Sequence, residues 1–66
     1  MSVKFMPLRD VIKATGLCRS AIYNGVAVGT FPKPVKLGLR AVAWVADEIE
    51  SWKSKRIVER DALEAR

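Results

Sequence analysis

Four side chains with hydrogen-bonding groups stand at a spacing that would place them on one face of a helix. They occupy positions i, i+1, i+4 and i+5, and they are Arg19, Ser20, Tyr23 and Asn24. An arginine can donate two hydrogen bonds to guanine O6 and N7, and an asparagine can pair with adenine N6 and N7. The serine hydroxyl can reach a phosphate or a base edge, and the tyrosine hydroxyl can donate to a phosphate. This face is therefore suited to polar recognition without bond making or breaking.

Each of the four residues also has a structural interpretation. Arg19 could be a solvated charge, but a cation is poorly placed at the positive end of a helix dipole, which favours a functional role. Ser20 could equally cap the first helical turn. Asn24 precedes Gly25, and this pair is typical of a turn, which is the favoured interpretation of Asn24. Tyr23 could lie at the edge of the core with its hydroxyl still free.

Three further cations, Lys33, Lys36 and Arg40, lie on or beside a predicted hairpin. Cations placed there can neutralise phosphates and release counterions, which makes binding depend on salt. Lysines on edge strands can instead prevent aggregation between strands. We favour phosphate contact for Lys36 and Arg40, and less so for Lys33.

Composition excludes most catalytic and metal chemistry. The 66 residues include no histidine and one cysteine, Cys18. This excludes a Ser-His or Cys-His nucleophile, an intramolecular disulfide and a zinc site of Cys and His ligands. A chain of this length forms one domain with a small core. We therefore expect no enzyme, no metal, no cofactor and no small-molecule substrate, and we expect Cys18 to be inert and semi-buried.

Positive charge is concentrated in the first two-thirds of the chain. Residues 1–45 carry seven basic side chains and one acidic one, residues 46–66 carry five basic and six acidic ones, and the net charge is +5. This distribution favours a surface that faces a polyanion, although the charges could merely keep a small domain soluble. The longest uncharged run, residues 20–32, cannot span a membrane, and the first residues do not form a signal peptide. We expect a cytoplasmic protein that contacts no membrane.

A first helix is predicted over residues 7–15. Pro7 suits the first helical position, and apolar residues follow at helical spacing. Gly16 is a typical helix end because glycine readily adopts the left-handed conformation. Leu17 comes next and is predicted to lie in the core.

A second helix, which would carry the polar face, is predicted to begin near Arg19. Its opposite face is formed by Ala21, Ile22, Gly25 and Val26. Two helices joined by a short turn that contains glycine form the helix-turn-helix pattern. The Asn24-Gly25 pair predicts that the second helix is short or distorted.

A small β-hairpin is predicted after the second helix. Pro32 and Pro34 exclude a helix and a central strand between them. Residues 35–37 and 40–44 are short strand candidates. Gly38 and Leu39 could form a two-residue type II′ turn, although a longer loop would also fit.

A third helix is predicted from Asp47, which forms a capping box with Glu50. Trp44, Trp52 and Phe31 are predicted to lie in the core because aromatic side chains supply much of the buried area in so small a domain. The apolar stripe loses its phase after Ile57, so the end of the chain is predicted to be exposed or to fray.

These elements predict a mostly helical α+β fold, a small winged helix-turn-helix. We expect residues 1–66 to form one DNA-binding domain, with a core over about residues 5–57 and a helical extension or frayed tail over residues 58–66.

The chain resembles the AlpA family of phage and prophage transcriptional regulators. The resemblance covers about residues 5–57, and it rests on motifs that come in the order and spacing of that family: Leu8-Arg9-Asp10-Val11-Ile12, Thr15-Gly16-Leu17, Arg19-Ser20, Ile22-Tyr23, Gly29, Phe31-Pro32, Pro34-Val35-Lys36-Leu37-Gly38, Arg40-Ala41-Val42, Trp44, Glu48-Ile49 and Trp52. The family is similar in fold to MerR-type winged helices and phage excisionases.

The resemblance implies a sequence-specific binder of double-stranded DNA that regulates transcription. It maps the DNA-facing helix onto Arg19, Ser20, Tyr23 and Asn24, and the wing onto Lys33, Lys36 and Arg40. One small module buries little surface on DNA, so a homodimer or a cooperative multimer on neighbouring half-sites is expected. Two alternatives stay open: an excisionase-like factor that bends DNA during recombination, and a protein-interaction module such as an anti-repressor.

Overall fold

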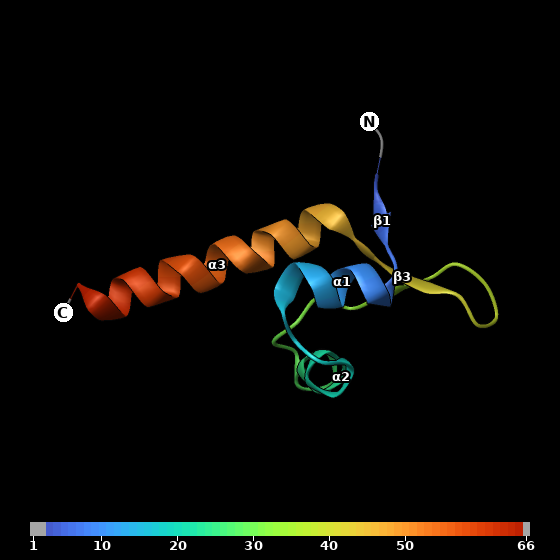
Figure 1. Cartoon of the computed structure of the whole chain (residues 1–66), viewed down its shortest axis with the longest axis horizontal. Helices are drawn as coiled ribbons and strands as arrows, with labels where there is room; N and C mark the ends of the chain where they lie inside the picture. Colours follow the sequence, from blue (N-terminus) through green and yellow to red (C-terminus); the bar gives the residue numbers. More distant parts are fainter. Residues whose placement is uncertain (1–2, 66) are drawn as a thin grey trace.

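The computed structural model describes residues 3–65 and shows three helices and three short strands over that range. Their order is β1 (Phe5–Met6), α1 (Leu8–Thr15), α2 (Arg19–Val28), β2 (Val35–Lys36), β3 (Val42–Val45) and α3 (Ala46–Glu64). Figure 1 shows α1 and α2 on one side of the strands, and α3 extending away along the longest axis of the molecule. The predicted mostly helical α+β fold, a small winged helix-turn-helix, is confirmed.

The strands form a small antiparallel sheet in the order β1-β3-β2. Phe5 pairs with Val45, and Lys36 pairs with Val42. Strand β1 was not predicted, because two residues are too short for a recognisable alternation and their pairing partner is distant in the sequence. The central strand β3 therefore connects the beginning of the chain to the hairpin.

A single apolar cluster holds these elements together. Its fully or nearly fully buried members come from α1, α2, the loop after α2, β3 and α3, and they are Val11, Ile22, Phe31, Trp44 and Ile49. Leu17 and Trp52 are partly buried and pack against this cluster. The core roles predicted for Leu17, Trp44, Trp52 and Phe31 are thus confirmed.

Helix α1 ends as predicted and begins one residue later than predicted. Gly16 closes it in the left-handed conformation, with φ 74°, and donates its backbone N–H to Ile12 O. Pro7 is the N-cap in an extended conformation rather than the first helical residue. Its carbonyl accepts the first helical hydrogen bonds, from Asp10 N and Val11 N.

Helix α2 is neither short nor distorted, which corrects the expectation drawn from Asn24-Gly25. It continues to Val28, and Gly25 is buried within it. A Cβ on Gly25 would lie 2.8 Å from Phe31 Cβ, so a close approach of the following loop requires glycine here. Ala21 is exposed rather than on the inner face, because it stands at the edge of the arc centred on Ile22.

The hairpin exists, but its turn is longer than the predicted two-residue type II′ turn. Strand β2 ends at Lys36 and β3 begins at Val42, so residues 37–41 connect them. Leu37 N and Gly38 N both donate to Ala41 O, at 2.7 and 3.3 Å. Among the glycines of residues 3–65, only Gly16 and Gly29 have a positive φ, so Gly38 does not adopt the type II′ conformation. Trp44 is fully buried in the core cluster, and its side of β3 is therefore the side that faces the core.

Helix α3 begins at Ala46, directly after β3, and not at a cap formed by Asp47. Val45 is the N-cap, and it makes no side-chain capping hydrogen bond. The backbone N–H of Ala46 donates instead to Lys4 O at 2.9 Å, so the strand pairing sets the start of the helix. The helix remains regular to Glu64, which makes the end of the described chain a helical extension with exposed side chains. Among the helices of residues 3–65, none has the length and apolar character needed to cross a membrane.

Candidate nucleic-acid interface

The outer face of α2 presents the four predicted polar residues to solvent. Arg19, Ser20 and Asn24 are exposed, and Tyr23 is 37% exposed. Ile22 and Gly25 are buried on the opposite face and anchor the helix to the core. The structure thus brings the four residues together on one accessible surface.

An aromatic stack connects this surface to the core. Arg19 Cζ lies 5.8 Å from the centroid of the Tyr23 ring. That ring in turn meets the Trp44 ring edge-to-face, with centroids 5.9 Å apart. Trp44 is fully buried, and its Nε1 donates to Pro32 O at 2.8 Å. The guanidinium is therefore placed by a fixed indole through one intervening ring.

Sequence reasoning predicted Trp44 as core but missed its role beneath the polar face. The i, i+4 spacing of Arg19 and Tyr23 could have indicated their contact, because residues four apart are neighbours on a helix. The contact between Tyr23 and Trp44 depends on how β3 packs behind α2, and it has no local sequence signal.

The first turn of α2 has no side chain that caps its free backbone N–H groups and no acidic side chain that offsets the positive end of its dipole. Cys18 is the N-cap and makes no side-chain capping hydrogen bond, and the first turn carries no acidic residue. Within residues 3–65, the Ser20 hydroxyl makes no hydrogen bond, so the capping interpretation of Ser20 is not realised. Cys18 is exposed rather than semi-buried, which corrects the expectation for that residue.

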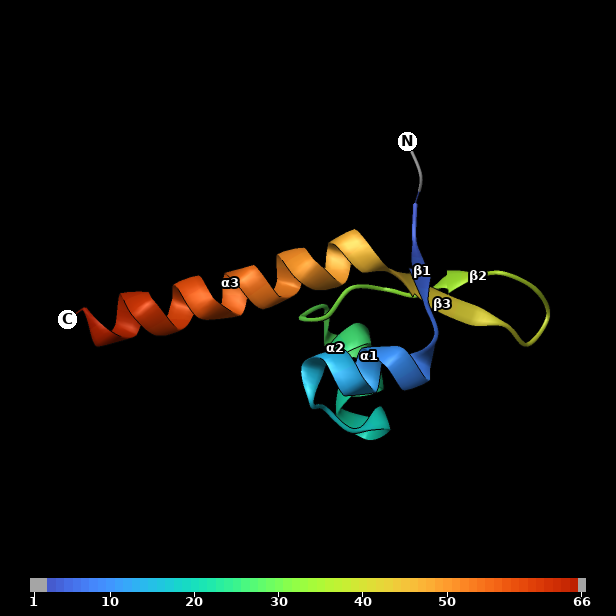
Figure 2. The same ribbon diagram turned by 45° about the horizontal axis from the view of Figure 1, so that its top comes forward.

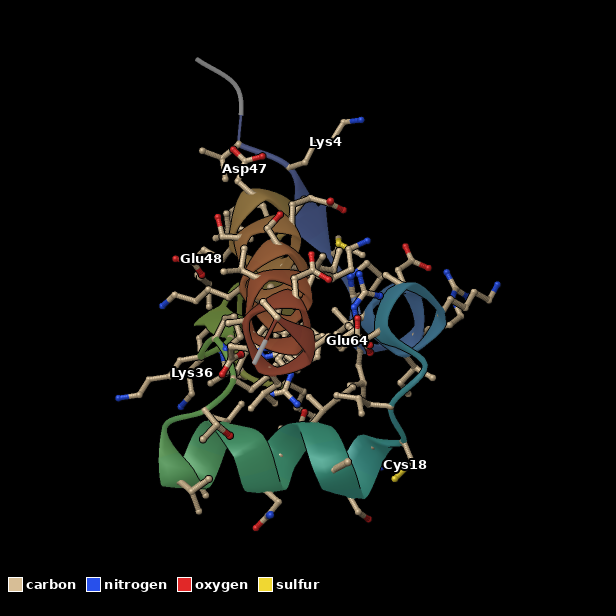
Figure 3. All side chains as sticks on the ribbon, turned by 90° about the vertical axis from the view of Figure 1, so that its left-hand side faces the viewer. Lys4, Cys18, Lys36, Asp47, Glu48 and Glu64 are labelled. Carbon is tan, nitrogen blue, oxygen red and sulfur yellow. The ribbon has the colours of Figure 1, made fainter. Side chains whose placement is uncertain are left out.

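The cations predicted for the wing are also exposed. Lys36 lies on β2, Lys33 lies in the loop before it, and Arg40 lies in the loop after it. Figure 3, which looks along α3, shows Lys36 directed outward on the side where α2 ends, while Cys18 marks the opposite end of α2. Lys36 therefore lies near the C-terminal end of α2, whereas Arg19, the one cation of α2, follows Cys18 at the N-terminal end of the helix.

Ion pairing separates the charges of α3 from those of α2 and the wing. On α3, Lys53 pairs with Glu50 at 2.9 Å and Arg56 pairs with Glu59 at 3.5 Å. Arg60 pairs with Asp61 on the same helix at 2.8 Å. Across residues 3–65 no Asp or Glu carboxylate lies within 4.0 Å of the charged nitrogens of four cations: Arg19, Lys33, Lys36 and Arg40. The positive charge of these four side chains is therefore uncompensated within the described residues, whereas on α3 only Lys55 lacks an ion pair among four cations.

A shallow groove lies between the loop after α2 and the first turns of α3. Its lining includes Phe31, Lys33, Asp47, Glu48 and Trp52. No group of three or more His, Cys, Asp or Glu side chains in the described part of the chain is placed to hold a metal ion. The two carboxylates that line the groove, Asp47 and Glu48, lie on α3 and not on the polar face of α2. The groove is therefore not part of the candidate interface.

Comparison with known proteins agrees with this architecture. The sequence model of the family described as prophage CP4-57 regulatory protein (AlpA) matches residues 4–57. The DNA-binding transcriptional activator AlpA of Escherichia coli (strain K12) is 36% identical over 61 residues, which cover 83% of this chain and 87% of that protein.

A second relative comes from a phage. The uncharacterized protein ORF88 of Enterobacteria phage P4 is 39% identical over 57 residues, which cover 86% of this chain. The match spans 65% of the length of the phage protein. The family match over residues 4–57 includes all three strands, α1, α2 and the first twelve residues of α3. The chain therefore belongs to the AlpA family of prophage regulatory proteins.

Proposed function

We propose that this protein binds double-stranded DNA in a sequence-specific manner and regulates transcription in a phage or prophage. Helix α2 would enter the major groove, and the hairpin would contact the neighbouring backbone or minor groove. The observation that carries this proposal is the exposed polar face of α2, whose Arg19 is held over Tyr23 and whose Tyr23 rests on the buried Trp44. No catalytic residue takes part in this function.

Each exposed residue receives a role from its chemistry. Arg19 would bind guanine O6 and N7, and Asn24 would bind adenine N6 and N7. Ser20 and Tyr23 would donate their hydroxyl groups to phosphates or base edges. The wing cations Lys33, Lys36 and Arg40 would contact phosphates, which adds affinity and no sequence preference.

The related activator and the distribution of charge support this assignment. The relative from Escherichia coli is named as a DNA-binding transcriptional activator. Arg19, Lys33, Lys36 and Arg40 have no ion-pair partner in residues 3–65, and a polyanion would meet them on α2 and around the wing. A protein that acts on phage or prophage DNA would work in the bacterial cytoplasm.

The proposed binding unit is small, so more than one copy is needed for useful specificity. A single module of this kind buries about 600–1,000 Å² of protein surface on DNA. We infer that residues 1–66 act as one domain and that two or more copies occupy neighbouring half-sites. Each copy would add its own contacts, and the affinities would multiply.

Selection of binding sites from a random DNA pool tests the proposal. The wild-type protein should enrich a defined sequence. Arg19→Ala should enrich a sequence relaxed at one position, because a bidentate contact discriminates between bases by about 1–3 kcal/mol. Lys36→Ala should enrich the wild-type sequence with weaker binding, and Lys55→Ala on α3 is the matched control for charge removal.

The same selection separates the proposal from a protein-interaction module. Such a module would enrich no sequence from the pool at any salt concentration. If Arg19→Ala enriched the wild-type sequence with unchanged affinity, α2 would not be the reading helix.

A further inference from the structure

The most exposed large apolar side chain of the described residues lies at the tip of the wing. Leu39 is 104% exposed, and every other exposed large hydrophobic side chain of residues 3–65 is 67% exposed or less. The last backbone hydrogen bonds of the hairpin run from Leu37 N and Gly38 N to Ala41 O. Residues 39 and 40 therefore lie beyond the last of these hydrogen bonds, with Leu39 at the tip.

Apolar exposure increases along the hairpin toward its tip. It rises from Val35 through Leu37 to Leu39. This gradient is the opposite of what a hairpin packed on its own domain would show. Figure 2 shows the loop projecting from the sheet at the end of the molecule opposite to the free end of α3. No part of residues 3–65 covers Leu39, so a surface that covers it would belong to another molecule.

The surroundings of Leu39 identify the chemistry of that molecule. Arg40 follows it directly, Lys36 lies on the strand below, and neither cation has an acidic partner within 4.0 Å in residues 3–65. A partner suited to this tip would accept an apolar side chain and offer negative charge beside it. The minor groove of DNA has this arrangement, because the gap between opened base pairs is apolar and is flanked by two phosphate backbones.

We propose that Leu39 is an apolar wedge that enters the minor groove of bound DNA and opens one base step, while Lys36 and Arg40 contact the flanking phosphates. Leucine is among the side chains that other proteins insert in this way, and insertion kinks the duplex. Pyrimidine–purine steps open most easily, so the bend should fall at such a step. The inference rests on the proposed function and extends it from binding to bending.

Bending and affinity measured on one duplex test the wedge. The probe is a DNA fragment selected from a random pool by the wild-type protein and labelled at both ends for energy transfer. Leu39→Ala should reduce the bend and lower the affinity about tenfold. Leu63→Ala removes another exposed leucine, on α3 beside Glu64, and should change neither quantity. Equal melting temperatures of the three proteins would show that each one folds.

Replacement of single base steps locates the wedge. Each pyrimidine–purine step of the selected fragment is changed in turn to an AA step, which is stiffer. One replacement should weaken binding of the wild-type protein and leave binding of Leu39→Ala unchanged. If every replacement weakened binding of the wild-type protein and of Leu39→Ala equally, the proposal that Leu39 opens a base step would be wrong.

The other outcomes distinguish the wedge from the function on which it rests. Unchanged bend and affinity for Leu39→Ala would overturn the wedge and leave DNA binding intact. If the wild-type protein selected no DNA, the proposed function and the wedge would both fail. If Leu39→Ala altered the sedimentation of the protein without DNA, Leu39 would contact a second copy of the chain, and the wedge would be rejected.

Discussion

Arg19 is held in place by its neighbours and not by an ion pair. Its guanidinium lies 5.8 Å from the Tyr23 ring centroid, and Tyr23 packs edge-to-face on Trp44. A cation over an aromatic ring at an exposed site gains about 0.5–1 kcal/mol. This contact restricts the rotamers of Arg19 before DNA is bound. The side chain therefore loses less conformational entropy on binding. Its placement at the positive end of α2 is unfavourable to helix stability, which a functional role explains.

Substitution of Tyr23 tests whether its ring positions Arg19. Tyr23→Leu removes the ring, so DNA affinity should fall about fivefold and the preference at the base read by Arg19 should weaken. Tyr23→Phe keeps the ring and should preserve that preference. Binding isotherms on the selected site and on a variant changed at that base measure both effects. Equal loss of preference in the two variants would show that the hydroxyl, and not the ring, is responsible.

At the scale of elements, α2 and the loop that follows it form a tightly packed unit. Gly25 O accepts hydrogen bonds from Thr30 N at 2.8 Å and Phe31 N at 3.2 Å. The Phe31 ring meets the Trp52 ring edge-to-face, with centroids 4.9 Å apart, and Trp52 Nε1 donates to Thr30 O at 3.1 Å. The loop is thereby clamped between α2 and α3, and it sets where the hairpin begins.

Gly25→Ala tests this clamp. Alanine in a helix interior gains about 1 kcal/mol over glycine, but here its Cβ would lie 2.8 Å from Phe31 Cβ. Overpacking of this kind costs about 1–3 kcal/mol, and the clamped loop leaves Phe31 little room to move. We expect a net loss of about 1–2 kcal/mol in the free energy of unfolding, measured by urea denaturation.

Gly38→Ala is the matched control for Gly25→Ala. The nearest heavy atom to a Cβ on Gly38 is 3.9 Å away, and this glycine has no positive φ. Its unfolding free energy should therefore stay within about 0.5 kcal/mol of the wild-type value. A stable Gly25→Ala protein would mean that the loop can shift without cost.

At the scale of the whole molecule, charge is divided between two ends. Figure 1 shows the wing at one end of the long axis and the last turn of α3 at the other. Three of the four cations of α3, Lys53, Arg56 and Arg60, pair with carboxylates of the same helix. The cations of α2 and the wing have no ion-pair partner in residues 3–65. DNA bound at α2 and the wing would therefore leave the end of α3 free for other contacts.

Salt titration tests this division. The logarithm of the binding constant should fall linearly with the logarithm of salt concentration, by about 0.9 for each phosphate contact. Lys36→Ala should reduce the slope by about 0.9, because one contact is lost. Lys55→Ala should leave the slope unchanged, because Lys55 lies on α3. Equal slopes for the wild-type protein and Lys36→Ala would remove the wing from the interface.

The sequence by itself determined the order of the three helices and the hairpin, and the polar face of α2. Local patterns suffice for these features: Gly16 ends a helix through its own conformation, and the spacing of Arg19, Ser20, Tyr23 and Asn24 follows from helical geometry. The absence of histidine from the composition also limited the chemistry without reference to any fold. The contacts of these four residues with DNA stay a prediction.

Tertiary structure alone decided the features that depend on residues far apart in the chain. Strand β1 forms because it meets β3, and α3 begins at Ala46 because Lys4 O accepts its N–H. Gly25 lies in a helix and not in a turn because Phe31 packs against it. Trp44 comes to lie beneath Tyr23 because β3 packs behind α2. The physical reason is common to all four: the free energy of a long-range contact outweighs a weak local preference, and no window of neighbouring residues contains that contact.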